Sequence, residues 1–104
     1  MSAKNPWSIL VAEDRDEILG NILIIAYGKK VSYLFRLAVR KEYRNQGVAS
    51  ALIQKAEEIV RQGGSVELGL YVDSGNIDMQ DFYKKRSFKI SPKSYFYMWK
   101  ELTV

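Results

Sequence analysis

The clearest chemistry in this sequence belongs to seven residues that join an apolar run to an amphipathic one: Arg44, Asn45, Gln46, Gly47, Val48, Ala49 and Ser50. The unpaired N–H groups and the macrodipole of a helix start normally attract Asp or Glu. Here no acid lies between Glu42 and Glu57. Small, neutral side chains behind a cation suit an external phosphate group. The alternative is an ordinary strand–turn–helix corner that uses Gly47 for tight geometry.

Two residue types that often carry catalysis are missing, because the chain has neither Cys nor His. It therefore has no thiolate nucleophile and no disulfide framework. It also lacks the commonest general base and the commonest transition-metal ligand. We expect no metal site, and any catalysis must use carboxylates, Tyr, Lys, backbone dipoles or water.

Length and composition indicate one small globular domain over residues 1–104, with 47% apolar and 27% charged residues. No apolar run approaches the roughly 18–20 residues of a membrane span. Residues 1–6 lack the apolar core of a signal peptide. We therefore expect a cytoplasmic protein with no membrane partner.

The net charge of +4 is unevenly distributed. Residues 84–100 carry six cations and no acid, whereas residues 62–83 carry four acids and no cation. Aromatic side chains between the cations would suit single-stranded nucleic acid. A polyphosphate ligand or a solvated face explains the same cations equally well, so we do not expect a nucleic-acid partner.

The first half of the chain predicts an antiparallel meander. Three apolar, β-branched runs at 7–12, 18–27 and 31–39 are separated by an acidic turn and by the turn that starts at Gly28. Their nearly continuous hydrophobicity predicts a sheet covered on much of both faces.

The second half alternates helical and strand patterns. Apolar residues at steps of three and four predict a helix over 46–61, which Gly63 and Gly64 end. A strand over 65–72 makes this unit a parallel crossover. A short helix over 77–86 and a final hairpin, 88–90 with 95–102, complete the order βββαβαββ, a mixed α/β sheet.

Two motifs now identify a resemblance. Residues 37–52 (LAVRKEYRNQGVASAL) resemble the acyl-CoA-binding motif of the GNAT superfamily of N-acyltransferases, whose pattern Arg/Gln-x-x-Gly-x-Gly/Ala is met by Arg44, Gly47 and Ala49. A second family motif is matched by Asn76, Phe82, Tyr83 and Phe88. The resemblance covers about residues 34–90 and implies a GNAT-like fold that uses acetyl-CoA.

The resemblance also implies roles for matching residues. Backbone amides from Gln46 to Ser50 would hold the CoA pyrophosphate, and Leu37, Ala38 and Val39 would form a strand edge that bonds pantetheine. This edge would splay from the 65–72 strand and open a V-shaped slot. The Val39 N–H would polarise the thioester carbonyl.

The second motif implies the remaining roles. Asn76 and Phe82 would join the cofactor site, and Tyr83 would protonate the departing thiolate. Asn76 is also explained as a helix N-cap, which is compatible with ligand contact. Tyr83 is also explained as a core aromatic on the inner face of a short helix.

The implied activity is transfer of an acetyl group from acetyl-CoA to a primary amine, on a small molecule or a protein. The amine would attack directly, so no covalent enzyme intermediate is needed. Candidates for the base are Glu67, Glu13 or a water chain. The alternative is a weak or inactive acetyl-CoA-binding sensor or partner-binding module, since the strand over 31–39 carries no Glu.

Two departures from the family pattern have consequences. Ser87 stands where the family has Gly, at a helix end where a left-handed residue is common. Only six residues precede Trp7, where the family usually has a strand and one or two helices. Apolar surface left exposed by their absence favours a homodimer, with the aromatic run 95–99 as its contact or, alternatively, as a core strand.

Overall fold

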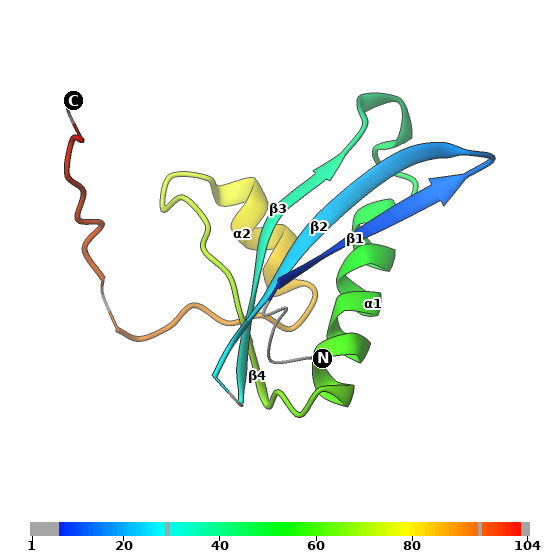
Figure 1. Cartoon of the computed structure of the whole chain (residues 1–104). Helices are drawn as coiled ribbons and strands as arrows, with labels where there is room; N and C mark the ends of the chain where they lie inside the picture. Colours follow the sequence, from blue (N-terminus) through cyan, green and yellow to red (C-terminus); the bar gives the residue numbers. More distant parts are fainter. Residues whose placement is uncertain (1–6, 29, 94, 103–104) are drawn as a thin grey trace. The chain divides into compact units, whose positions relative to one another are not determined.

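The computed structural model describes residues 7–28, 30–93 and 95–102 (Figure 1). The chain divides into two compact units, Met1–Tyr71 and Val72–Val104. The first unit holds a sheet and one helix, and the second holds a short helix followed by a segment without regular structure in its described residues.

The sheet of the first unit has the strand order β1-β2-β3-β4. Its strands are β1 (Trp7–Asp14), β2 (Glu17–Tyr27), β3 (Val31–Val39) and β4 (Glu67–Gly69). The first three are antiparallel neighbours and β4 pairs parallel to β3, as the meander and the crossover predict. Arg15 and Asp16 fill the β1–β2 turn with left-handed φ values of 50° and 67°, the pattern of a tight hairpin turn.

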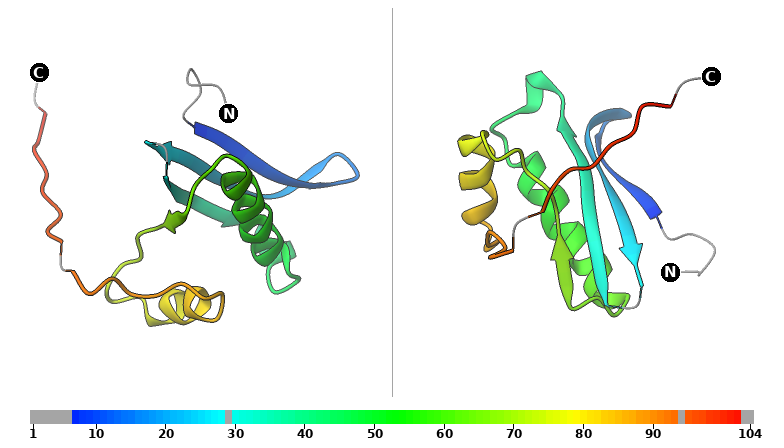
Figure 2. Two further views of the ribbon diagram at one scale, coloured as in Figure 1. Left: turned by 90° about the horizontal axis from the view of Figure 1, so that it is seen from below. Right: turned by 90° about the vertical axis from the view of Figure 1, so that its left-hand side faces the viewer.

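Helix α1 (Val48–Gln62) supplies the core of the first unit. It lies along one face of the sheet, as Figure 2 shows from below. Its buried side chains repeat at steps of three and four, and they meet the buried residues of β2 and β3. The buried apolar residues of this unit are Ile22, Ile24, Leu34, Leu52, Ile53, Ala56 and Val60. One polar residue joins them: Ser32 Oγ lies 2.7 Å from Ser65 Oγ.

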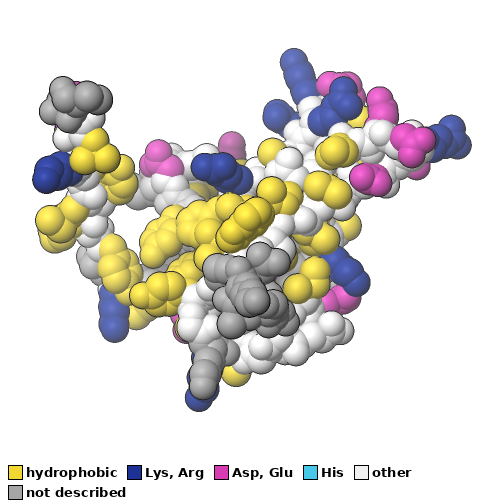
Figure 3. All heavy atoms as spheres, viewed as in Figure 1, with side chains coloured by type: hydrophobic (Ala, Val, Ile, Leu, Met, Phe, Trp, Pro, Cys, Tyr) yellow, Lys and Arg dark blue, Asp and Glu magenta, His cyan; other side chains and the backbone are white. Residues whose placement is uncertain are grey.

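The predicted cover on both faces of the sheet is wrong for β1. Trp7, Ile9 and Val11 are 56%, 60% and 41% exposed. They share a face with their β2 partners, and that face is opposite the one that carries the buried Ile22 and Ile24. Figure 3 shows hydrophobic side chains exposed over the sheet. A strand with apolar side chains on both faces can therefore leave one face exposed.

In the second unit, helix α2 (Ile77–Lys84) begins at Asn76, whose Oδ1 accepts a hydrogen bond from the Met79 N–H at 3.1 Å. The N-cap interpretation of Asn76 is confirmed. Three residues after the helix, Ser87 has φ 71°. The left-handed position expected of the family's Gly is thus present and occupied by Ser.

The predicted final hairpin is wrong. The described residues from 88 to 102 contain no strand. The side chains of Phe96, Tyr97 and Met98 are 87–93% exposed, so the alternative of a core-facing strand is wrong as well. Aromatic residues favour strands only where a neighbouring strand or a core receives them. The strand predicted over 65–72 is likewise shortened to Glu67–Gly69, and Val66 is 80% exposed.

Candidate functional site

The start of α1 has the properties of an anion site. Its first turn contains no acid, and its N-cap, Gly47, has φ 84°. The first hydrogen bond of the helix runs from Ala51 N–H to Gly47 C=O at 3.0 Å. The N–H groups of Val48 and Ala49 therefore have no acceptor within the helix. Two donors and the positive end of the macrodipole meet at one point.

The loop before this helix is held by its own side chains. Arg44 Nε donates to the Val39 carbonyl at 3.1 Å, and Gln46 Nε2 donates to the Glu42 carbonyl at 3.1 Å. Asn45 and Gly47 both take left-handed conformations, with φ 63° and 84°. These turns explain why α1 begins at Val48 and not at Gln46 as predicted. Arg44 thus connects the loop to the end of β3, a role that sequence reasoning missed.

The backbone at Gly47 is sterically open. A Cβ built on this residue would have no heavy atom within 4 Å. The positive φ favours Gly at this position, and the space beside its Cα is open. A phosphate group fits both conditions.

The second part of the site is the C-terminal half of β3. The parallel ladder to β4 joins Val31–Tyr33 to Glu67–Gly69 and ends there. Beyond it, β3 continues past β4 to Val39 (Figure 1). Among the described residues, Leu37, Ala38 and Val39 therefore have a strand neighbour only on the β2 side. These are the residues at which the resemblance implies a splayed edge.

A bulge separates these residues from the rest of β3. Leu23 pairs with Phe35 and Asn21 pairs with Ala38, so β3 has one extra residue in this interval. Arg36 in the bulge has φ 56°. The extra residue changes which face the following side chains occupy. No Gly marks this bulge, so it could not be predicted from the residue types.

An open depression of about 570 Å³ lies at this end of the sheet. Its lining includes Ala38, Val39 and Arg40 from the end of β3, and Glu17 from the start of β2. Glu17 Oε1 lies 3.9 Å from Arg40 Nη1, and Glu17 Oε2 accepts a 2.5 Å hydrogen bond from the Tyr43 hydroxyl. This hydrogen bond raises the pKa of Tyr43 above its ordinary value. The Glu17 carboxylate thus interacts with both Arg40 and Tyr43.

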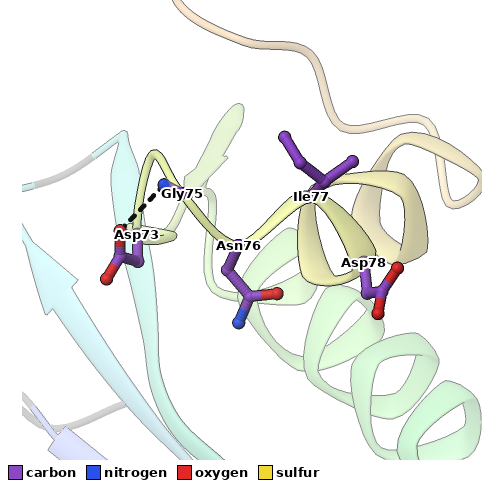
Figure 4. A pocket seen from close by; sticks show the side chains of 5 residues that line it. All are labelled: Asp73, Gly75, Asn76, Ile77 and Asp78. Carbon is purple, nitrogen blue, oxygen red and sulfur yellow. Dashed lines mark hydrogen bonds between the residues drawn. The ribbon is translucent and has the colours of Figure 1, made fainter.

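Asn76 lies in a second depression, within the second unit (Figure 4). The loop before it is closed by a hydrogen bond from the Gly75 N–H to Asp73 Oδ1 at 2.9 Å. Asn76 Oδ1 is used by the helix cap. Its Nδ2 group remains as a donor, so the cap leaves Asn76 able to contact a ligand.

Tyr83 is 8% exposed and packs between two aromatic neighbours. Its ring centroid is 5.1 Å from that of Phe82 and 5.5 Å from that of Phe88, both in edge-to-face geometry. Burial raises the pKa of Tyr83, and the charge of Arg86 opposes that rise. No buried polar side-chain atom in the described part of the chain lacks a partner. The Tyr83 hydroxyl, for which no hydrogen bond is found there, therefore reaches solvent.

Phe82 has a different environment. The Arg86 guanidinium lies 3.6 Å from the centroid of its ring, and Arg86 Nη1 donates to the Phe82 carbonyl at 2.6 Å. One face of Phe82 is thus covered by a cation, which fixes the orientation of the ring.

The candidate bases Glu13 and Glu67 are both exposed. In the described ranges, no group of three or more His, Cys, Asp or Glu residues could hold a metal ion. No helix in those ranges is long and apolar enough to cross a bilayer.

The structure brings together one part of the predicted site. Leu37–Val39 and Arg44–Ser50 lie in the first unit, where the Arg44–Val39 hydrogen bond joins them. Asn76, Phe82 and Tyr83 lie in the second unit, on or beside α2.

Comparison with known proteins gives a family match. Residues 1–88 match the model of the acetyltransferase (GNAT) family. An uncharacterized N-acetyltransferase of Chlorobaculum tepidum is 31% identical over 96 residues, which are 89% of this chain and 58% of the relative. The spermidine N(1)-acetyltransferase of Thermoplasma acidophilum is 35% identical over 57 residues, which are 55% of this chain and 35% of the relative. The chain thus spans less than two thirds of both relatives.

The fold also matches those of solved structures. The structure of AAC(6')-Iy in complex with the bisubstrate analog CoA-S-monomethyl-acetylneamine matches with a TM-score of 0.80 at 17% identity. The match covers 92% of this chain and 71% of that chain. The predicted GNAT fold is confirmed, and the described residues contain a mixed four-stranded sheet and two α-helices.

Proposed function

This chain belongs to the GNAT family of acetyltransferases, and we propose that it transfers an acetyl group from acetyl-CoA to a primary amine. The observation that carries the proposal is the pairing of an acid-free helix start with a strand end that has a neighbour on one side only. We further propose that both units act together as one acetyltransferase domain over residues 1–104.

The proposed cofactor site begins at α1. Backbone amides from Gln46 to Ser50 would hold the pyrophosphate, with the N–H groups of Val48 and Ala49 as the donors that lack helical acceptors. The open space at Gly47 supports this assignment. Arg44 and Asn45 complete the loop, Arg44 through its bond to the Val39 carbonyl.

The edge of β3 would hold the rest of acetyl-CoA. Backbone groups of Leu37, Ala38 and Val39 would bond pantetheine as an added strand would. The Val39 N–H would polarise the thioester carbonyl as its oxygen gains negative charge. Because Arg44 holds the Val39 carbonyl, the peptide group that follows Val39 is already oriented before a ligand arrives.

The proposed reaction is a direct transfer. The neutral amine attacks the thioester carbon, a C–N bond forms, and the C–S bond breaks. Tyr83 gives its proton to the departing thiolate, and its raised pKa keeps that proton in place at neutral pH. The proton lost by the amine leaves through Glu13, Glu67 or water. Asn76 and Phe82 would contact the cofactor beside Tyr83.

The Tyr83→Phe variant tests this proposal. We expect kcat to fall by about 10²–10⁴-fold, the usual contribution of a general acid, with acetyl-CoA affinity measured by calorimetry nearly unchanged. The amine panel should include spermidine, the acceptor that the name of one relative contains. Tyr95→Phe, at a tyrosine that is 69% exposed, is the matched control. Equal activity of Tyr83→Phe and wild type would remove Tyr83 from the mechanism.

A second function, acetyl-CoA binding without turnover, is favoured by one observation. Tyr83 is buried between Phe82 and Phe88, which is enough to explain its presence as a packing residue. Wild-type protein that binds acetyl-CoA but acetylates no amine in the panel would favour this sensor function. Failure to bind acetyl-CoA at millimolar concentration would exclude both functions.

A further inference from the structure

The two edges of the sheet are not equally protected. Among the described strands, β1 and β4 form the edges. Natural sheets avoid unwanted pairing by keeping edge strands short or by placing Lys, Pro or a bulge on them. Strand β4 is three residues long and follows this rule, whereas β1 is eight residues long.

The sequence of β1 has none of these protections along most of its length. Residues 7–12 carry no charge and no Pro. The irregularity in its pairing with β2 lies only near its end, between Ala12 and Glu13. Its outer row of backbone N–H and C=O groups has no strand partner in the described part of the chain. Only another extended strand can form a regular set of hydrogen bonds with such an edge.

The side chains of β1 add apolar surface beside that edge. Trp7, Ile9 and Val11 lie on one face, because they pair with Ile25, Leu23 and Asn21 across the sheet. All three are exposed, Ile9 to 60%. A strand added to this edge would gain apolar contacts on that face as well as backbone hydrogen bonds.

We propose that β1 pairs in antiparallel fashion with β1 of a second copy of this chain. A two-fold axis perpendicular to the sheet generates this arrangement and closes it as a dimer. The four strands of each copy then form one continuous sheet of eight. The proposal concerns assembly and is independent of acetyl-CoA chemistry.

The register of the β1–β1 pair follows from the face on which each side chain lies and from the positions of the charged residues. Directly opposed residues of antiparallel strands share a face, so odd-numbered residues of β1 must meet odd-numbered ones. Centring the axis at Ile9 places Trp7 of each copy opposite Val11 of the other. The paired stretch 7–11 is then uncharged on both copies, and Glu13 and Asp14 fall outside it. The strand is therefore complementary to itself, without like-charge repulsion.

The first test is the oligomeric state of the full chain by sedimentation equilibrium. We expect a dimer, and we expect Ile9→Lys to raise its dissociation constant by about 100-fold, because each interface would lose two apolar side chains and gain two facing cations. Circular dichroism checks that the variant is folded. Phe96→Lys is the control, since Phe96 is 93% exposed, more than any other apolar residue in the described part of the C-terminal segment. A monomeric wild type, or a dimer broken by Phe96→Lys and unaffected by Ile9→Lys, would overturn the proposal.

The second test uses the absence of cysteine from the chain. In the proposed register the two copies of residue 9 face each other, so Ile9→Cys should form a disulfide-linked dimer under mild oxidation. In Ser8→Cys, the Cα atoms of the two cysteines would lie about 8 Å apart, which is too far for a disulfide. Equal crosslinking of the two variants, or none with Ile9→Cys, would contradict this pairing.

Discussion

Placing a carboxylate in the first turn of α1 should separate fold stability from cofactor binding. Ala49 is the second residue of the helix, in a turn that contains no acid. In Ala49→Asp the new charge favours the positive end of the helix, by about 0.3–1 kcal/mol. Asp has a lower helix propensity than Ala by about 0.6 kcal/mol. The two effects nearly cancel, so we expect the free energy of unfolding to change by less than about 0.5 kcal/mol.

Acetyl-CoA binding should respond much more strongly. The Ala49 N–H is a proposed donor to the pyrophosphate, so the new carboxylate would lie about 5 Å from a phosphate group. At that distance two like charges repel by about 1–3 kcal/mol in partly hydrated surroundings. The dissociation constant of acetyl-CoA should therefore rise by about 10- to 100-fold. Added salt should reduce this difference, because screening weakens the repulsion.

Ala51→Asp is the matched control, with the same change of residue and charge on the same helix. Ala51 is exposed, lies two residues further along α1, and donates its N–H to Gly47. We expect its acetyl-CoA affinity to change by about three-fold or less. Calorimetric titration measures binding and urea denaturation measures stability. If folded Ala49→Asp binds acetyl-CoA as tightly as Ala51→Asp does, the cofactor phosphates do not lie at the start of α1.

Three further predictions follow from backbone geometry and burial. Gly20→Ala should destabilise the protein by about 1–3 kcal/mol, because the new Cβ would lie 2.6 Å from the Ala38 carbonyl oxygen. Gly75→Ala should change the urea midpoint far less, because the nearest atom to its new Cβ would be 3.5 Å away. Ser87→Gly should stabilise the fold by about 1 kcal/mol, since φ is 71° there, and an unchanged urea midpoint would argue against strain. Because the pKa of Tyr83 is raised in the folded state, the unfolded chain ionises first as the pH rises. The stability that Tyr83 contributes is therefore complete below pH 10 and is progressively lost above it. Tyr83→Phe should lose less stability than wild type between pH 9 and 11, and identical alkaline melting curves would refute this.

Local patterns predicted β3 and α1 of the first unit well because their apolar residues mark them clearly. The run over 31–39 is a strand with the predicted bounds, and α1 repeats its apolar residues at helical steps into a single core. Asn76 caps α2 because its short side chain reaches the free N–H groups of the first turn.

Patterns failed where structure depends on partners or on unusual dihedral angles. The aromatic residues 95–99 have strand propensity, but a strand requires a neighbour, and the described structure gives them none. The left-handed φ values of Arg36 and Asn45 occur without a Gly, so composition does not mark them. The Arg44–Val39 hydrogen bond depends on that turn, which is why it could not be found from spacing. The separation of the predicted site residues between two units is likewise invisible in the order of motifs.

The hydroxyl pair of buried Ser32 and half-buried Ser65 has a consequence for the order of folding. It joins residues 33 apart in the chain, at the point where three residue pairs connect β3 to β4. Closing so long a loop costs chain entropy before any contact forms, whereas the hairpins of β1–β3 close over short turns. We expect the meander to form first and the parallel contact late. Ser32→Ala should then speed unfolding and leave the refolding rate nearly unchanged, a φ-value near zero.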